Sequence, residues 1–239
     1  MIISPYSVSL MRLDKFVCKS TTLTKNEGLE CIAEGRVKVN AEVVTVESTQ
    51  VHENNHVTLN GDLLTARPFR YLLMNKPANT ICSNIDEVYP SLFNYIKEGN
   101  NSELHIAGRL DSDTTGLVLI TDDGRWSYNI ITPSKKCEKV YRVGLRHIIT
   151  SEAITKIELG VQLQGELELT RPAKLKIITE REVLLTITEG KFHQVKRMFS
   201  AVGNKVILLH REQIGEISLD VNEGEWRYLT DYEVNSFEH

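Results

Sequence analysis

The 239-residue chain changes its pattern at ARPFR, residues 66–70. Before this segment, helical spacing gives way to short alternating β patterns, whereas after it strands and helices mix without regular alternation. Arg67 precedes a proline, which biases it away from helical backbone angles and suits a joint between domains. We therefore expect a small domain at 11–66 and a larger one at 70–235. The irregular order favours an α+β fold over a doubly wound sheet.

The small domain is predicted to hold two helices followed by a small sheet. Residues 11–19 place apolar side chains on one helical face. Thr24 and Glu27 have the spacing of a capping box, and Gly35 can end the second helix in a left-handed conformation. Residues 37–46 and 56–64 alternate as strands broken by turn residues.

The larger domain is predicted to contain a mixed, mostly antiparallel sheet flanked by helices. The patterns indicate strands at 71–75, 117–121, 139–145, 173–178, 182–188 and 205–209. They indicate helices at 91–99, 151–160 and 191–203.

The formal net charge of -4 argues against nucleic-acid binding by bulk positive charge, but the charge is unevenly distributed. Residues 134–146 carry five Lys or Arg against one Glu, and residues 189–211 show a similar excess. Such patches can neutralise phosphates. The four cysteines form no CxxC pair, which favours free thiols in a reducing cytoplasm. No stretch approaches the roughly 20 apolar residues of a membrane span, and MIISPYSVSL lacks the basic start of a signal peptide.

Two metal-binding patterns fail on their surroundings. HENNH at 52–56 matches the zinc-protease motif, which needs a helix, yet Asn54 and Asn55 favour a turn. Asp111 and Asp113 mimic the start of a calcium loop, but the β-branched run that follows Gly116 leaves no exiting helix. No metal site is predicted.

GRLDSDTTGLVLITDDG at 108–124 raises the question of what Asp111 does. Its Asp-x-Asp-x-Thr spacing resembles the nucleophile loop of haloacid-dehalogenase phosphatases, but there the Asp ends a buried apolar strand, and here Ala-Gly-Arg-Leu precedes it. Alternatively, Asp111 is a covalent nucleophile of another kind, kept ionised by a nearby cation such as Arg109.

Further candidate residues come from the two basic patches. The core stripe of the helix predicted at 191–203 leaves His193 and Arg197 on the opposite face and Lys196 on its flank. Tyr141 stands among cations on a predicted strand, where an aromatic ring can stack on a nucleic-acid base.

These motifs together resemble the bacterial pseudouridine synthases of the small-subunit rRNA type. The central match is GRLDSDTTGLVLITDDG, and the other matches follow in the family's order: NKP at 75–77, CEKVYRV at 137–143, EGKFHQVKRMF at 189–199 and HREQIG at 210–215. RLDKF at 12–16 and EGRVKVN at 34–40 are similar to an S4-like RNA-binding domain. The chain departs from that domain at Thr24-Lys25, where Ser-Arg is usual, and at Ala41, where Gly is common.

The resemblance implies roles for individual residues. Asp111 would be the nucleophile, Arg109 would help hold the target base out of the RNA, Tyr141 would stack on that base, and either Lys196 or Arg197 would pair with Asp111. The implied RNA-binding residues are Arg12, Lys15, Lys25 and Arg36 in the S4-like domain, with Lys76, Lys191 and His193 in the catalytic domain.

The resemblance also implies the reaction. Uracil is detached from its ribose, rotated and reattached through C5, an isomerisation that needs no cofactor. The expected target is uridine 516 of 16S rRNA, either naked or within an assembling small subunit, and the expected enzyme is a cytoplasmic monomer that contacts no membrane. The alternative is a non-catalytic rRNA-binding factor for ribosome assembly.

Overall fold

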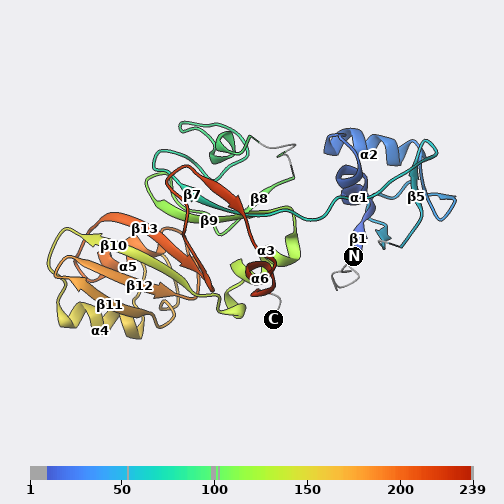
Figure 1. Ribbon diagram of the computed structural model, residues 1–239. Coiled ribbons are helices and arrows are strands. Elements are labelled where there is room, and N and C mark those ends of the chain that lie inside the picture. Colours follow the sequence, from blue (N-terminus) through green and yellow to red (C-terminus); the bar gives the residue numbers. More distant parts are fainter. Residues whose placement is uncertain (1–9, 53, 98–100, 102, 238–239) are drawn as a thin grey trace. The chain divides into compact units, whose positions relative to one another are not determined.

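The computed structural model describes residues 10–52, 54–97, 101 and 103–237, and it divides between Pro68 and Phe69 into two compact units (Figure 1). This division lies inside the 66–70 segment at which the sequence pattern changes. One apolar cluster fills the first unit and two fill the second. No helix in the described part of the chain is long and apolar enough to cross a membrane.

Two helices and two small sheets form the first unit. The helices are α1 (Leu13–Ser20) and α2 (Lys25–Ala33). Thr24 and Glu27 form the predicted capping box, with the Glu27 carboxylate accepting from the Thr24 backbone at 2.7 Å. One sheet is antiparallel in the order β3 (Glu42–Val43), β2 (Val37–Val39), β5 (Val57–Leu59), β6 (Asp62–Leu63). The other pairs β1 (Met11–Arg12) with β4 (Gln50–Val51).

Both hairpin turns of the four-stranded sheet use left-handed backbone conformations. Asn60 and Gly61 have φ of 54° and 97°, while Asn40 and Ala41 have φ of 49° and 71°. Two consecutive left-handed residues match the twist of the flanking strands, which is why Asn-Gly is the preferred sequence there. Ala41 takes the position of that glycine and bears the strain of a Cβ atom in this region.

A single mixed sheet dominates the second unit, as predicted. The strands lie in the order β11 (Lys174–Thr179), β12 (Glu182–Ile187), β10 (Lys139–Leu145), β13 (Val206–Ile214), β9 (Thr115–Thr121), β7 (Tyr71–Lys76), β15 (Trp226–Tyr228). In addition, β8 (His105–Ala107) pairs with β9 and β14 (Ile217–Ser218) with β13. Every pairing is antiparallel except that of β13 with β9, which joins only His210 to Thr115 and Arg211 to Gly116.

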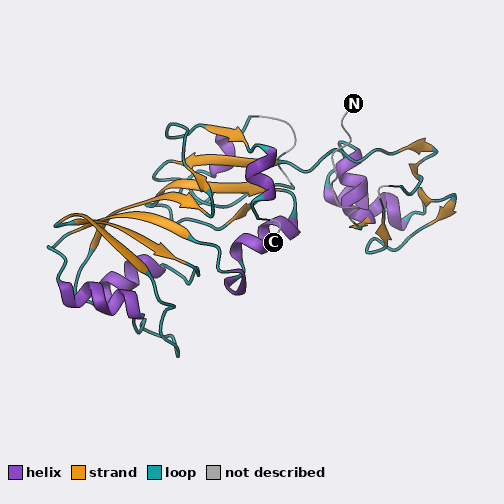
Figure 2. Ribbon diagram, turned by 60° about the horizontal axis from the view of Figure 1, so that its bottom comes forward, coloured by secondary structure: helices purple, strands orange, loops and turns teal. Residues whose placement is uncertain are grey.

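Helices cover this sheet unevenly. In Figure 2, a fan of strands carries helices along one side. These helices are α4 (Ser151–Leu159) and α5 (Gln194–Ala201), which pack on the half formed by β10–β13 through Ile157, Val195 and Phe199. The other half packs against α3 (Gly124–Ile131) and α6 (Asp231–Asn235). The indole N–H of Trp126 in α3 donates to the Val234 carbonyl at 2.9 Å and ties those two helices together.

Two helix predictions need correction. The helix expected at 91–99 is a single 3₁₀ turn, η1 (Leu92–Tyr95), because the Ser91 hydroxyl caps the Phe93 amide and Ile96 bonds back to Phe93 after three residues. Residues 98–100 lie outside the described part. The helix expected at 191–203 begins only at Gln194, since the residue before it is left-handed. The four cysteines are free, as predicted.

Candidate active site

Asp111 lies in the loop between β8 and β9, at the point where the two halves of the sheet meet. The loop turns tightly, with the Thr114 amide donating to the Asp111 carbonyl at 3.1 Å. At the end of the loop, β13 approaches β9 so closely that a Cβ on Gly116 would lie 2.3 Å from the Arg211 carbonyl oxygen. Glycine is therefore required there, and its φ of 104° is one that other residues rarely adopt.

Two basic side chains from the start of α5 reach the Asp111 carboxylate. Lys196 Nζ lies 2.8 Å from Oδ2, and His193 Nε2 lies 3.3 Å from Oδ1. Lys196 Nζ also lies 2.6 Å from Oδ1 of Asp113. Although partial burial acts against it, the hydrogen bonds to these two carboxylates raise the pKa of Lys196 above its usual value. Asp111 is 29% exposed, so its carboxylate is accessible as well as held.

His193 does not lie on the helix face that its spacing predicted. It precedes α5 in a left-handed conformation, with φ of 46° and ψ of 34°. The Gln194 side chain fixes the approach to this residue, because it accepts from the Lys191 amide at 2.8 Å and donates to the Glu189 carboxylate at 2.7 Å. The ring of Phe192 stacks on the imidazole with centroids 3.7 Å apart.

Arg197, the other candidate partner of Asp111, points elsewhere. Its guanidinium donates to Glu166 at 3.2 Å and to the carbonyls of Phe192 and Gln164. Lys191 lies 3.2 Å from the same Glu166 carboxylate. Of the two cations that the sequence left open, the geometry brings Lys196 to Asp111 and ties Arg197 to the loop before β11.

Tyr141 lies deeper than a freely stacking ring would. It is 7% exposed and packs in the same apolar cluster as Leu110. Its hydroxyl accepts from Arg211 Nη1 at 3.2 Å. Arg211 is 1% exposed and also donates to the carbonyls of Gly108 at 2.6 Å and Leu117 at 2.7 Å. Arg211 thus connects Tyr141 to both ends of the Asp111 loop.

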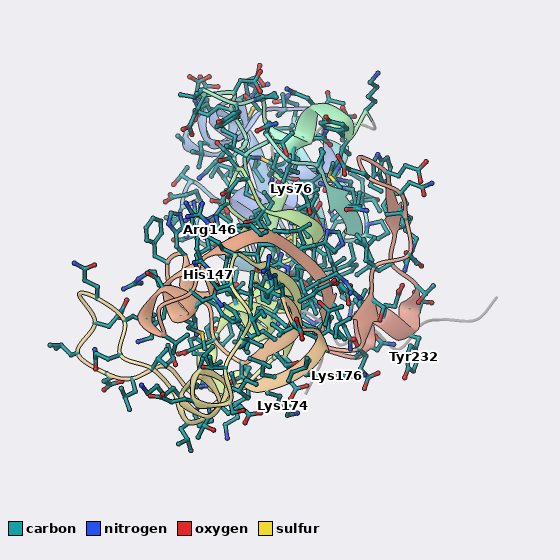
Figure 3. The ribbon with its side chains drawn as sticks, turned by 90° about the vertical axis from the view of Figure 1, so that its left-hand side faces the viewer. Lys76, Arg146, His147, Lys174, Lys176 and Tyr232 are labelled. Atoms are coloured by element: carbon teal, nitrogen blue, oxygen red, sulfur yellow. The ribbon has the colours of Figure 1, made fainter. Side chains whose placement is uncertain are left out.

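Lys76 supports this loop from inside instead of facing RNA, which corrects its predicted place on a binding surface. It is 0% exposed, and Nζ donates to the carbonyls of Thr114 at 2.9 Å, Pro77 at 3.0 Å and Ser112 at 3.3 Å. Burial lowers the pKa of Lys76. Figure 3 shows its place among the side chains of the larger unit.

Apart from Lys76 and the half-buried Lys191, the predicted RNA-binding residues are exposed. Arg109 follows the Gly108 turn, and within the described residues its side chain makes no hydrogen bond or ion pair. Lys15 and Lys25 lie on the surface of the first unit. Arg12 pairs with Asp14 at 2.8 Å, and Arg36 donates to Asn60 at 3.0 Å.

Sequence reasoning missed several residues of this region. Asp113 shares Lys196, Glu166 restrains Arg197, and Arg211 holds Tyr141. The sequence offered a signal for Asp113, which lies two residues from Asp111. Arg211 belongs to the basic segment 189–211, for which the sequence predicts phosphate binding. Its burial could not be predicted, because a single buried arginine leaves no local pattern in the sequence. Among the described residues, no cluster of His, Cys, Asp and Glu could hold a metal ion.

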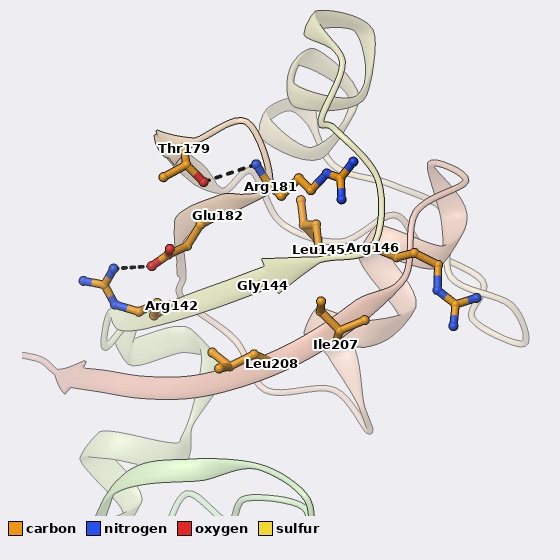
Figure 4. A pocket seen from close by; sticks show the side chains of 9 residues that line it. All are labelled: Arg142, Gly144, Leu145, Arg146, Thr179, Arg181, Glu182, Ile207 and Leu208. Carbon is orange, nitrogen blue, oxygen red and sulfur yellow. Dashed lines mark hydrogen bonds and ion pairs between the residues drawn. The ribbon is translucent and has the colours of Figure 1, made fainter.

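A hollow of about 480 Å³ opens on the face of β10 that alternation turns away from α4 and α5 (Figure 4). Arg142 lies at its edge with its guanidinium between Glu182 and Glu212. Arg146 also lines the hollow, and its neighbour in the chain, His147, lies beside it in Figure 3. Neither Asp111 nor its partners His193 and Lys196 line this hollow.

The chain is similar to known proteins over nearly its whole length. Residues 70–201 match the family model described as RNA pseudouridylate synthase, and residues 11–57 match the S4 domain. The ribosomal small subunit pseudouridine synthase A of Vibrio cholerae is 48% identical over 95% of this chain and 99% of its own length. The protein of the same name from Escherichia coli strain K12 is 43% identical over 95% of this chain and 99% of its own. A crystal structure titled as a pseudouridylate synthase superposes with a TM-score of 0.70 at 43% identity, covering 95% of this chain and 99% of that one.

Proposed function

Because the chain belongs to the RNA pseudouridylate synthase family, we propose that it isomerises a uridine of small-subunit ribosomal RNA to pseudouridine with Asp111 as nucleophile. The observation that carries the proposal is the Asp111 carboxylate, which is partly exposed in its loop and lies 2.8 Å from Lys196 Nζ. The two relatives named as small-subunit pseudouridine synthases support the choice of RNA.

The site residues support a division of labour around Asp111. Lys196 donates to the Asp111 carboxylate at 2.8 Å and aims it, as an activated nucleophile requires. Arg109 is exposed beside the same loop and can take the place that the extruded uridine leaves in the RNA. Extrusion costs a few kcal/mol, which contacts to the RNA backbone offset. The exposed part of the Tyr141 ring is expected to form the floor of the base site.

We propose 16S rRNA, at uridine 516, as the substrate, either naked or within an assembling subunit. Exposed cations on the first unit, Arg12, Lys15, Lys25 and Arg36, support RNA contact by the S4 domain. The chemistry exchanges one bond to ribose for another and oxidises nothing, so we expect no cofactor. A cytoplasmic monomer remains our expectation.

The test is release of tritium from C5-labelled uridine in 16S rRNA, with wild type compared to Asp111→Asn on naked RNA and on partly assembled subunits. Wild type is expected to release tritium and Asp111→Asn is not, while both bind RNA. Asp113→Asn is the matched control, because it removes a neighbouring carboxylate that also binds Lys196. We expect it to keep measurable release.

Mapping the modified nucleotide then identifies the target position. Absence of release by wild type from either substrate, with binding intact, would refute the enzyme and favour an rRNA-binding assembly factor. Equal loss in the Asp111 and Asp113 variants would refute the specific role of Asp111.

A further inference from the structure

His193 combines backbone strain with direct proximity to the proposed nucleophile. A non-glycine residue in the left-handed region is strained, and such residues cluster at functional sites. This residue offers no side-chain cap to α5. Its conformation instead directs Nε2 to within 3.3 Å of Asp111 Oδ1, with the side chain 42% exposed.

The proposed isomerisation has a proton to move. When C5 of the detached uracil bonds to C1′ of the ribose, C5 carries both that bond and its original hydrogen, and a double bond lies between C6 and N1. To form pseudouridine, C5 loses its hydrogen as a proton and the C5–H electron pair becomes the C5–C6 double bond. The C6–N1 π pair moves to N1, which takes up a proton. One proton leaves and one arrives, and nothing is oxidised.

The groups around Asp111 differ in their ability to accept the C5 proton. The raised pKa of Lys196 keeps it protonated, and Arg109 is a permanent cation. The Tyr141 hydroxyl is buried against the Arg211 guanidinium. A histidine can accept a proton at neutral pH, which makes it the most common general base.

We propose that His193 is the general base that removes the C5 proton, a role that rests on the proposed function. Formation of the C5–C1′ bond releases the Asp111 carboxylate from the sugar; Nε2 then takes the C5 proton, and the imidazolium that forms lies against the freed carboxylate. The charged groups that face the imidazole are Asp111 and Asp113 from the β8–β9 loop and Lys196 from α5. The imidazolium then returns a proton to N1 directly or through solvent.

The experiment compares wild type with His193→Gly in single turnovers on 16S rRNA transcribed with protium or deuterium at C5 of uridine. Glycine accepts the left-handed backbone and leaves space for a free base. We expect His193→Gly to be about 100-fold slower or more, in line with the loss of a general base, and to show a C5 isotope effect well above that of wild type. Added imidazole is expected to restore the rate.

His193→Asn is the second variant, because asparagine also tolerates the left-handed region but cannot act as the base. It carries the isotope measurement if the glycine variant fails to bind RNA. A wild-type rate in either variant, or a slow rate with an unchanged isotope effect and no response to imidazole, would overturn the role of His193. Failure of wild type to release C5 tritium would instead count against the pseudouridine synthase function.

Discussion

Replacing Arg211 by lysine is expected to damage the site from beneath while keeping its charge. The guanidinium makes three hydrogen bonds, to the Gly108 carbonyl, the Leu117 carbonyl and the Tyr141 hydroxyl. These acceptors surround a planar fork, and because a lysine concentrates its donors at one point, we expect its ammonium to reach only one of them. Two buried acceptors then lose a charged donor at about 1–2 kcal/mol each. The free energy of unfolding should therefore fall by about 2–4 kcal/mol.

Calorimetry on the full chain measures this loss. For a unit of this size, each kcal/mol lowers Tm by about 2–4 °C, so Arg211→Lys should lower the transition of the larger unit by about 5–15 °C. Arg142→Lys is the matched control. Arg142 lies on β10, the strand next to β13, and it pairs with Glu182 and Glu212 where its side chain is partly exposed. An exposed pair contributes about 0–1 kcal/mol. Equal Tm shifts in the two variants would refute the argument from burial.

Three further predictions test separate parts of the structure. Lys196→Met should reduce the single-turnover rate at least about 100-fold because it removes the partner of Asp111. Arg197→Met should mainly loosen the loop that holds Glu166. Equal rate losses in the two variants would contradict Lys196 as the partner of Asp111. Ala41→Gly should stabilise the first unit by about 0.5–1 kcal/mol because it relieves a left-handed alanine, and hydrogen exchange of the 37–43 hairpin would detect the gain; slower exchange in wild type would refute it. The hydrogen bonds from Arg227 lower the pKa of Glu233 from 4.5 to about 2, so the stability that this carboxylate contributes is present above pH 4.5 and lost as pH falls through about 2. The Tm difference between wild type and Glu233→Gln should therefore shrink over that range, and a difference independent of pH would count against the pair.

The sequence predicted the strands better than the site because strand patterns are local. The strand predicted at 139–145 has the same bounds as β10 in the structure. The capping box at Thr24 is likewise local, since two side chains three residues apart satisfy each other's backbone groups. Features that depend only on near neighbours can be read without the fold.

The site depends on contacts that no local pattern records. Helical spacing predicts His193 on a helix face. In the structure, the Gln194 side chain instead bonds to Lys191 and Glu189, α5 begins at Gln194, and His193 before it is left-handed. Burial of Lys76 and Arg211 depends on the packing of β7 and β13 beside β9. A count of basic residues in the sequence therefore includes Lys76 and Arg211, which are buried and cannot contact RNA.

Two buried cations restrain the loop that carries Asp111, the proposed nucleophile. Lys76 binds the carbonyls of Ser112 and Thr114, and Arg211 binds those of Gly108 and Leu117, so the loop is held on both sides of Asp111. All four of these bonds go to backbone carbonyls, so both cations act on the backbone of the loop. Because these bonds are present without substrate, we expect the proposed reaction to need little reorganisation of the loop, which is the condition for strong electrostatic catalysis. The strained His193 on the other side of Asp111 can then serve proton transfer while the buried cations maintain the geometry.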